Sequence, residues 1–499
     1  MNRAIKTHSL QLSYQRGKTD LNKITHIFRH IRNNHPIELK YDKGTILIDG
    51  NINTPYSVYD PRVDKNRSLA RHYQDITCFL EKNNQDYIDN VKDYIDCPIQ
   101  VKTNDTNVLR DYQKDALESW LSQNKKGCII LPTGAGKTVI AIKAITEINS
   151  STLIIVPTLN LMEQWFRSIK NILADKTLVG MLGGGYDDIR MITVTTYESA
   201  YLKSSFLGNK FRFLIFDEVH HLASEKYYSI GEHFISPCRL GLTATIERED
   251  GRHVIVFKLI GNIVYKKDFY ELAEKNYLAN FKLKKRTISM LPDEIALYNN
   301  KISQYRKILK ECKIFYPIKL ERLIILSANN NELRKALLLR KEAQETALNS
   351  KAKIIELEKI LKEYGNERKI IIFTIHTKLA YTISDRFLIP VITHKTKNEE
   401  RNEILDGFKN GRYRIITTTK VLDEGTDIPD ANTGIILSGT GSKREFVQRL
   451  GRLLRPKDDR ENVAELIEII SSDTSETFTS TKRNKGIKEK KGISDTKPK

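Results

Sequence analysis

The sequence predicts an α/β protein with two tandem parallel-sheet domains, a helical insert between the two sheets and a small mixed domain at the N-terminus. Short β-branched runs alternate with amphipathic segments from about residue 108 to 470, which is typical of βαβ units. Between about 291 and 364 the chain is charged, rich in Leu, Ile and Ala and almost free of Gly and Pro, which predicts helices. The length of 499 residues exceeds one ordinary domain of about 100–200 residues.

Short apolar runs predict the strands of both sheets. They are Gly127–Leu131, Leu153–Val156, Met191–Val194 and Phe213–Phe216 in the first sheet, and Ile370–Phe373, Tyr413–Thr417 and Gly434–Leu437 in the second. Several of these runs are followed at once by turn or polar residues. Because open α/β sheets bind ligands at the carboxyl ends of their strands, we expect the chemistry there.

These patterns divide the chain into four parts. We expect an accessory domain over 1–104, a first α/β domain over 105–268, a second α/β domain over 269–470 that carries the insert at about 291–364, and a disordered basic tail over 471–499. The tail is rich in Ser, Thr and Lys, and it has too few apolar side chains to offset the entropy of ordering. The pattern of residues 1–104 does not indicate a particular fold.

The charge of the chain favours a polyanionic partner. Lys and Arg number 82 against 62 Asp and Glu, a net charge of +20, which is typical of proteins that bind nucleic acid or an anionic membrane surface, with solubility alone as the alternative. No run approaches the ~18–20 apolar residues of a membrane span, and no secretory signal begins the chain. We therefore expect no membrane partner and a cytoplasmic or nucleoid-associated location. The five cysteines are scattered without a Cys-x-x-Cys pair, so we expect reduced packing residues.

A glycine-rich loop follows the predicted strand Gly127–Leu131 and precedes an apolar-periodic segment that should be a helix. The loop consists of Pro132, Thr133, Gly134, Ala135, Gly136, Lys137 and Thr138. Backbone N–H groups of such a loop and the positive end of the helix hold phosphate oxygens. We expect Lys137 to reach the β- and γ-phosphates of ATP and Thr138 to bind Mg²⁺. Leu131 stands where the general P-loop pattern has a glycine.

The strand Phe213–Phe216 ends in two adjacent carboxylates, which are costly beside a buried strand unless they hold a cation. Asp217 is expected to bind Mg²⁺ through water, and Glu218 to orient and deprotonate the water that attacks the γ-phosphate. A helix N-cap is the alternative, but the position about 80 residues after the glycine loop favours catalysis. His220 is either a core histidine or, directly behind the carboxylates, a residue that couples hydrolysis to the neighbouring domain.

The second α/β domain contains candidates for the arginine that speeds phosphoryl transfer. Gln448, Arg452 and Arg455 are spaced i, i+4 and i+7, so they share one helix face. Arg452 and Arg455 are expected to point together at a γ-phosphate. An exposed basic face is the alternative, and the restricted spacing argues against it.

Taken in order, these motifs resemble those of the superfamily 2 helicases over about residues 105–460. The resemblance implies two RecA-like motor domains and an adenine-side element in which Gln113 reads the base edge with Arg110 nearby. It also implies a motif that links DNA to the nucleotide, with Gly425 and Asp427. The implied contacts to a nucleic-acid strand are Pro157, Thr158, Thr196, Thr243 and Thr245 in the first motor domain and Thr374 and Thr418 in the second.

A narrower resemblance is to the XPB repair helicases, in a short form like that of archaea. Arg248, Glu249 and Asp250 follow the Thr-Ala-Thr motif, and in that family an Arg-Glu-Asp triplet is associated with strand separation; a solvated surface triplet is the alternative. Leu131 and Pro132 before the loop are also similar to that family. The resemblance implies a thumb for the helical insert and a damage-recognition domain for the N-terminal segment, although no motif within 1–104 indicates this.

The resemblance implies an ATP-dependent 3′-to-5′ DNA helicase or translocase that acts in repair on single strands and on forks or junctions. A UvsW-type branch-migration enzyme, a double-strand translocase and, less favoured, an RNA helicase would use the same motor. From other classes, the chain could be a scaffold that clamps DNA for a nuclease or repair partner, or a restriction-type enzyme. Five intact residues speak against a scaffold: Lys137, Asp217, Glu218, Arg452 and Arg455. No nuclease constellation is recognisable in the N-terminal segment or the tail.

Overall fold

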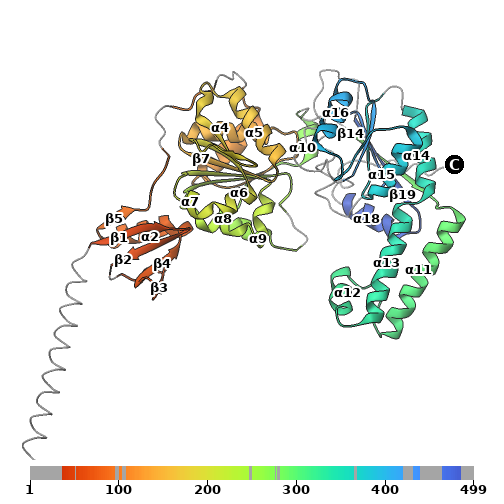
Figure 1. Cartoon of the computed structure of the whole chain (residues 1–499), viewed down its shortest axis with the longest axis horizontal. Coiled ribbons are helices and arrows are strands. Elements are labelled where there is room, and N and C mark those ends of the chain that lie inside the picture. The colour runs from red at the N-terminus through yellow and green to blue at the C-terminus, as the bar shows by residue number, and fades with distance from the viewer. Residues whose placement is uncertain are drawn as a thin grey trace, which may run out of the picture. The chain divides into compact units, whose positions relative to one another are not determined.

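The computed structural model of the chain describes residues 36–50, 52–95, 100–103, 108–246, 250–275, 277, 281–364, 368–419, 431–438 and 464–484. The described residues form two units, one within residues 36–130 and 138–266 and the other within 131–137 and 267–484 (Figure 1). The first unit holds a small N-terminal domain and an eight-stranded sheet, and the second holds a six-stranded sheet with a helical protrusion. The predicted α/β class, with its two motor sheets, helical insert and mixed N-terminal domain, is confirmed.

The N-terminal domain is a mixed five-stranded sheet covered by one helix. Its elements are β1 (Ile37–Asp42), β2 (Thr45–Asp49), β3 (Val58–Asp60), β4 (Lys65–Leu69), η1 (Ala70–His72), α2 (Tyr73–Lys82) and β5 (Tyr87–Asn90). The strand order is β3-β4-β2-β1-β5, in which only the β1–β5 pair is parallel. Leu39, Ile46, Ile48 and Leu80 are fully buried in its core. Ile235 of the first motor domain joins the same core, so the two domains are packed together.

The first motor domain is built on a largely parallel sheet in the order β13-β6-β12-β11-β7-β10-β8-β9. Its strands are β6 (Lys126–Ile130), β7 (Thr152–Val156), β8 (Val179–Gly183), β9 (Tyr186–Asp187), β10 (Ile192–Thr196), β11 (Phe213–Asp217), β12 (Cys238–Thr243) and β13 (Ile263–Lys266). Only the β8–β9 hairpin is antiparallel. All four predicted strands of this sheet are present.

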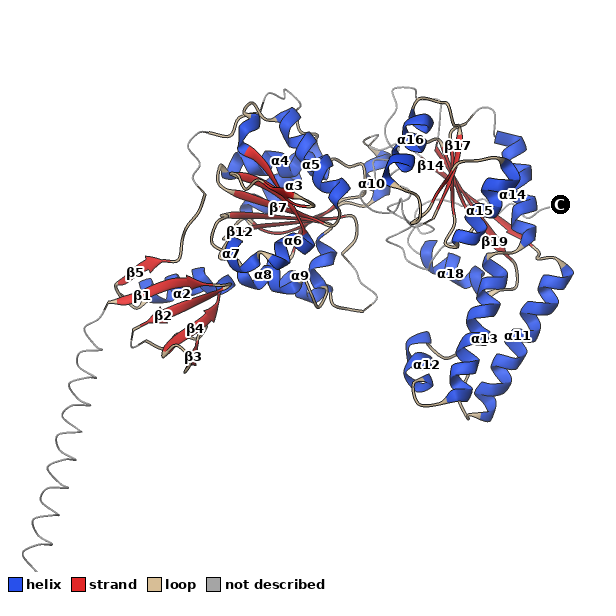
Figure 2. Cartoon of the chain, viewed as in Figure 1, coloured by secondary structure: helices blue, strands red, loops and turns tan. Residues whose placement is uncertain are grey.

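Helices cover both faces of the first motor sheet. They are α3 (Asp111–Ser122), α4 (Lys137–Ile148), α5 (Leu159–Ile172), α6 (Tyr197–Leu202), α7 (Ser204–Leu207), α8 (Tyr228–His233) and α9 (His253–Ile260), with short 3₁₀ turns η2 (Lys176–Leu178) and η3 (Val219–Ala223). Figure 2 shows α4 and α5 on one face and α7, α8 and α9 on the other. Because both faces are covered, the central strands are mainly apolar, as in β7 and β11, whose residues are all buried.

The second motor domain has a wholly parallel sheet in the order β14-β19-β18-β15-β17-β16. Its strands are β14 (Phe281–Ile288), β15 (Ile370–Phe373), β16 (Val391–Ile392), β17 (Ile415–Thr418), β18 (Thr433–Ile436) and β19 (Ala464–Ser471). Its helices are α10 (Phe269–Glu274), α14 (Lys351–Tyr364), α15 (Thr377–Phe387), α16 (Asn398–Lys409) and α18 (Ser475–Asn484). The three predicted strands of this sheet are present.

The helical protrusion consists of α11 (Pro292–Glu311), α12 (Leu320–Ser327) and α13 (Asn331–Leu348). Figure 1 shows α11 and α13 side by side with α12 at the far end. The protrusion has its own core, in which Tyr305, Leu309 and Leu323 are buried. It ends before α14, whose Ile354 and Leu357 pack into the core of the sheet. The helical insert predicted to about residue 364 therefore contains a helix that belongs to the motor domain itself.

The prediction of a disordered tail is wrong for residues 471–484, which include the end of β19 and helix α18. Helix α18 is docked by Glu476, whose carboxylate lies 2.6 Å from the Nζ atom of the fully buried Lys353. The same ammonium donates to the carbonyl of Leu437 at 2.7 Å, and the Ser471 N–H donates to Glu476 at 3.0 Å. This ion pair joins residues more than a hundred positions apart, so composition could not reveal it. Within the part of the chain that the structure describes, no helix has the length and apolar character to cross a membrane.

Candidate nucleotide and nucleic-acid site

The glycine-rich loop connects β6 to the N-terminus of α4. Gly134 and Gly136 have φ angles of +84° and +75°, a left-handed backbone that favours glycine. The Lys137 ammonium lies over the loop and donates to the carbonyls of Leu131 at 3.1 Å and Pro132 at 3.4 Å. The loop therefore opens its amide groups at the positive end of a helix, as a phosphate-binding loop requires.

Two threonines of the loop fit the expected ligands. The Thr133 hydroxyl is buried without a hydrogen-bond partner among the described residues, which is costly unless a ligand occupies it. Thr138 is the second residue of α4 and is partly exposed. Ala135 closes the turn, since its N–H donates to the Pro132 carbonyl at 3.2 Å. These features suit the phosphates of ATP with a cation at Thr138.

The order of the strands brings the predicted catalytic residues to one sheet edge. Strand β12 lies between β6 and β11, and all three are parallel. Thr243, the last residue of β12, pairs with Ile130 before the loop, and the neighbouring Leu242 pairs with Asp217. The glycine loop, Thr243 and Asp217 therefore leave adjacent strands at the same carboxyl edge.

Asp217 is held in place by an indole that the sequence did not identify as part of the nucleotide site. Trp165 of α5 donates from Nε1 to Oδ2 of Asp217 at 2.8 Å, and both side chains are buried. The N–H of Glu218 donates to the other carboxylate oxygen at 3.0 Å. The carboxylate is thus oriented from both sides. Finding the indole from sequence would have needed the packing of α5 on the sheet.

Glu218 has a strained backbone. Its φ and ψ angles of 47° and 54° are left-handed, which is uncommon for a residue other than glycine and costs of order 1–3 kcal/mol. Such strain clusters at functional sites. Beneath this turn, the Tyr197 hydroxyl donates to the Asp217 carbonyl at 3.1 Å. Burial raises the pKa of Tyr197 far above its usual value, and Asp217 and Glu218 raise it further, so the phenol stays a neutral donor.

A buried polar cluster links Glu218 to the end of β12. The Thr243 hydroxyl lies 3.1 Å from Oε2 of Glu218 and 3.1 Å from Nδ1 of His220. It also lies 2.8 Å from the Thr245 carbonyl. His220 is buried with its Nδ1 atom 3.4 Å from Oε2 of Glu218. Thr243 is fully buried and its side chain lies against the Glu218 carboxylate, while the contact to a nucleic-acid strand that the resemblance implies stays a prediction.

The other predicted contacts of the first motor domain lie at the same sheet edge. Thr158 follows β7, and Thr196 is the last residue of the adjacent strand β10. Their hydroxyls cap α5 and α6 by accepting from the N–H groups of Leu161 and Ser199 at 3.3 and 3.2 Å. Pro157 precedes Thr158. These threonines therefore have a structural role as N-caps, whatever their backbone amides bind.

The remaining predicted residues of the first motor domain are less informative. Gln113 is buried, and its side-chain Oε1 atom accepts from the Arg110 N–H at 3.0 Å, so Gln113 stabilises the start of α3. The Thr245 hydroxyl is buried without a hydrogen-bond partner among the described residues. Asp250 accepts from the Arg252 N–H at 3.1 Å. Arg248 and Glu249 lie outside the described residues.

In the second motor domain, Thr374 and Thr418 are both fully buried. Thr374 shares a hydrogen bond of 2.9 Å with Ser438, and the Thr418 hydroxyl donates to the Thr419 carbonyl at 2.9 Å. Their side chains thus support the ends of β15 and β17. The other predicted residues of this domain lie outside the described residues: Gly425, Asp427, Gln448, Arg452 and Arg455.

Comparison with known proteins gives matches along the whole of this architecture. The xeroderma pigmentosum group B helicase damage recognition domain matches residues 39–91, the res subunit of type III restriction enzymes matches 106–248, and the helicase conserved C-terminal domain matches 319–457. The DNA 3′-5′ translocase XPB2 of Sulfurisphaera tokodaii is 44% identical over 453 residues, which cover 90% of this chain and 99% of that protein. The chain belongs to the XPB helicase family.

Other XPB relatives are more distant. The DNA 3′-5′ helicase XPB of Mycobacterium tuberculosis is 27% identical over 361 residues, which cover 70% of this chain and 58% of that protein. A helicase/translocase subunit of the general transcription and DNA repair factor IIH, from Arabidopsis thaliana, is 27% identical over 405 residues, which cover 75% of this chain and 48% of that protein. The predicted resemblance to the XPB family is confirmed, and the N-terminal domain matches the family's damage-recognition domain.

Replacing Trp165 with Phe is expected to raise the Mg²⁺ concentration at which ATP hydrolysis reaches half its maximal rate. The variant keeps an aromatic ring but loses the hydrogen bond that orients Asp217, and loss of such a supporting contact costs roughly 10–100-fold in metal affinity or activity. Steady-state ATP hydrolysis measured against Mg²⁺ concentration should show a raised half-saturation. Trp120→Phe is the matched control, since that indole donates to the Arg239 carbonyl away from this edge. An unchanged Mg²⁺ dependence for Trp165→Phe would mean that Trp165 does not contribute to Mg²⁺ binding.

Proposed function

We propose that this chain is an ATP-driven motor that moves 3′ to 5′ on DNA and separates strands during DNA repair. The observation that carries the proposal is the arrangement at the carboxyl edge of the first motor sheet, called here the nucleotide edge. Adjacent parallel strands bring together the loop of Lys137, the carboxylates of Asp217 and Glu218, and the buried Thr243. The names of the XPB relatives, DNA 3′-5′ translocase and helicase, agree with this function.

The roles of the individual residues follow from their chemistry. Lys137 balances the charge on the β- and γ-phosphates, and Thr138 and Asp217 hold Mg²⁺, which neutralises the charge that develops during phosphoryl transfer. Glu218 orients the attacking water and accepts its proton. Arg452 and Arg455 are proposed from the sequence pattern alone as the residues that stabilise the transferring phosphoryl group.

We also propose that the polar cluster around Thr243 transmits the state of the nucleotide. Glu218, His220 and Thr243 contact one another, and Thr243 ends the strand that leads into Thr245 and the segment with the Arg-Glu-Asp triplet. A change in the hydrogen bonding of Glu218 during hydrolysis would therefore act directly on the chain that carries Asp250. This gives His220 the coupling role predicted from its position.

A second candidate function is translocation along duplex DNA without strand separation. It is favoured by one observation, that the relative at 44% identity is named a translocase. Displacement of one strand from a forked duplex, compared with displacement of a third strand from a triplex, distinguishes the two. Unwinding of the fork supports the helicase, whereas triplex displacement with an intact fork supports the translocase. A repair or nuclease partner remains a further proposal.

Binding to single-stranded DNA is expected to weaken steeply as salt increases. The chain carries a net charge of +20, and each phosphate contact releases counterions, which gives a slope of about −0.7 per contact in log K against log salt. Titrations of a labelled oligonucleotide at several NaCl concentrations measure this slope. Binding that is indifferent to salt would argue that the positive charge serves a protein partner instead.

A further inference from the structure

A basic pocket of about 190 Å³ lies where the N-terminal domain meets the first motor domain. Four cationic side chains line it: Arg71 from η1, Lys126 from β6, Arg239 from β12 and Lys258 from α9. Among the described lining residues, the only acid is Asp75, which lies 3.0 Å from Nδ1 of His72. The pocket therefore concentrates positive charge at a junction of two domains.

This pocket is separate from the nucleotide edge. Lys126 is the first residue of β6, Ser236 precedes β12 and Gly261 precedes β13, so the pocket is at the amino ends of these parallel strands. The glycine loop and Asp217 lie at their carboxyl ends. A ligand in the pocket would not be the nucleotide that drives the motor.

Hydrogen bonds outside the pocket also join the N-terminal domain to the first motor domain. The Tyr41 hydroxyl of β1 lies 3.2 Å from the carbonyl of His233 and 3.3 Å from that of Ser204. Asn209 donates to the Val91 carbonyl at 3.0 Å. At the pocket itself, the Lys126 ammonium lies 3.4 Å from Oε1 of Gln74, a weak contact.

Arg239 is the most unusual member of the pocket because it is almost completely buried. Its guanidinium donates to four backbone carbonyls at 2.7–3.1 Å, those of Gly231, Phe234, Ser236 and Leu259. Carbonyl dipoles satisfy the N–H groups but do not cancel the charge. Burial, with a further contribution from the nearby Arg71, lowers the pKa of Arg239 to about 10.

Arg71 has a buried N–H group that lacks an acceptor among the described residues, which also indicates an anion in the pocket. Its Nε atom is buried without a hydrogen-bond partner in the described structure, although the rest of the side chain is partly exposed. A buried N–H of Arg71 without an acceptor, near the buried charge of Arg239, is unfavourable unless an anion accepts from it. The pocket is smaller than the roughly 300–1,000 Å³ of typical cofactor sites, so it suits a single anionic group.

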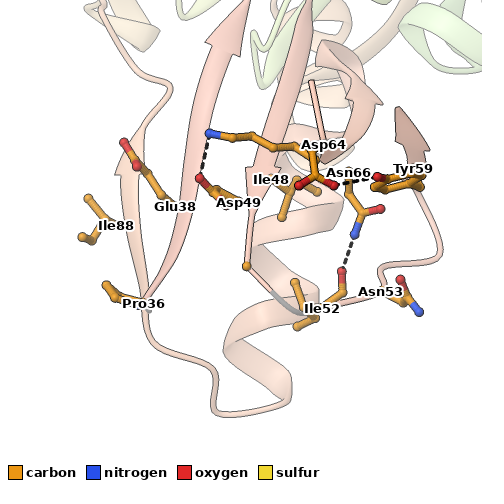
Figure 3. A pocket seen from close by; sticks show the side chains of 12 residues that line it. Pro36, Glu38, Ile48, Asp49, Ile52, Asn53, Tyr59, Asp64, Asn66 and Ile88 are labelled. Carbon is orange, nitrogen blue, oxygen red and sulfur yellow. Dashed lines mark hydrogen bonds and ion pairs between the residues drawn. The ribbon is translucent and has the colours of Figure 1, made fainter. Parts of the chain in front are cut away.

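A larger pocket in the N-terminal domain shows the opposite chemistry. It has a volume of about 550 Å³ and is lined by Glu38, Asp49 and Asp64 (Figure 3). Its one lysine, Lys65, is paired with Asp49 at 2.7 Å, and Tyr59 donates to Asp64 at 2.6 Å. These acids are unsuited to an anion, so the basic pocket is the better anion site of the two.

We propose that the basic pocket binds a phosphate group and thereby holds the N-terminal domain on the first motor domain. Arg71 and Lys126, one from each domain, would contact the phosphate together, while Arg239 contributes buried charge behind them. The phosphate is either a free anion or part of a DNA backbone, which is the same chemistry from two sources. The proposal goes beyond the ATP-driven function and does not depend on it.

The first arm of the test uses inorganic phosphate on the full chain. Thermal unfolding midpoints are measured against phosphate at constant ionic strength, with Mg²⁺ and saturating ADP present so that the glycine loop is occupied. The midpoint of the wild type should rise with phosphate. The apparent affinity should fall by roughly tenfold or more in Arg71→Gln and Lys126→Gln, because a hydrogen bond to a charged group contributes about this factor. Lys126→Arg should retain it.

The second arm measures binding of duplex DNA by the same variants against NaCl. Loss of one phosphate contact should lower the slope of log K against log salt by about one. Lys82→Gln, an exposed lysine of α2 outside the pocket, is the matched control. An effect of Arg71→Gln and Lys126→Gln in the first arm assigns a free phosphate, and an effect in the second arm alone assigns the DNA backbone. If the two pocket variants behave like Lys82→Gln in both arms, the proposal is overturned.

Discussion

Glu218→Gln should stop ATP hydrolysis while leaving ATP binding intact. Glutamine keeps the size of the side chain and can still accept a hydrogen bond from Thr243, but it cannot take a proton from water. Loss of a general base lowers turnover by about 10²–10⁴-fold. Single-turnover hydrolysis and the binding of a fluorescent ATP analogue measure the two properties separately.

The control for this variant is Glu118→Gln, which removes the same charge from the exposed surface of α3. It should leave both binding and turnover near the wild-type values. If Glu218→Gln instead lost ATP binding and retained turnover per bound nucleotide, Glu218 would be a binding residue. The strained backbone of Glu218 would then need a different explanation.

Glu476→Ala should destabilise the second motor domain by about 3–5 kcal/mol, the usual cost of leaving one member of a buried ion pair without its partner. Lys353 is fully buried and is held by Glu476 and the Leu437 carbonyl. Removal of the carboxylate would leave a buried ammonium with one backbone acceptor among these contacts. Urea unfolding followed by circular dichroism should show the second domain melting earlier.

Two further variants separate this effect from a simple loss of contact. Glu311→Ala removes an exposed pair with Lys307 and should cost no more than about 1 kcal/mol. The double variant Lys353→Met with Glu476→Leu removes both charges and should recover most of the lost stability. If the single and double variants lost the same free energy of unfolding, the packing of α18 and not the unpaired charge would explain the destabilisation.

The sequence predicted the parts of the fold whose signals are local. The glycine loop could be predicted because Gly134 and Gly136 adopt positive φ angles, which favour glycine. Strands β7 and β11 could be predicted because strands buried on both faces contain runs of apolar residues. Strand β12 was not predicted, because the buried Arg239 and Gly241 interrupt its apolar run. The guanidinium N–H groups of Arg239 are satisfied by the carbonyls of Gly231 in α8 and Leu259 in α9, and the pattern of β12 alone does not reveal these contacts.

The same limit applies to the site. Lys137, Asp217 and Glu218 were predicted as site residues from their spacing and their places at strand ends. The supporting residues Trp165 and Tyr197 were not assigned to Asp217, because their contacts depend on how α5 and α6 pack on the sheet. Likewise, the order of the tail around α18 depends on Lys353, which lies far away in sequence.

The most direct test of the central claim is ATP hydrolysis by the wild type and by Lys137→Ala, each with no nucleic acid, with single-stranded DNA, with forked duplex and with RNA. We expect DNA to stimulate the wild type more than RNA does, and Lys137→Ala to show no hydrolysis under any condition, because the phosphates lose their main cationic side chain. Two results would contradict the account of an ATP-driven DNA motor. One is a wild-type rate of ATP hydrolysis that no nucleic acid changes, and the other is a near-normal rate in Lys137→Ala.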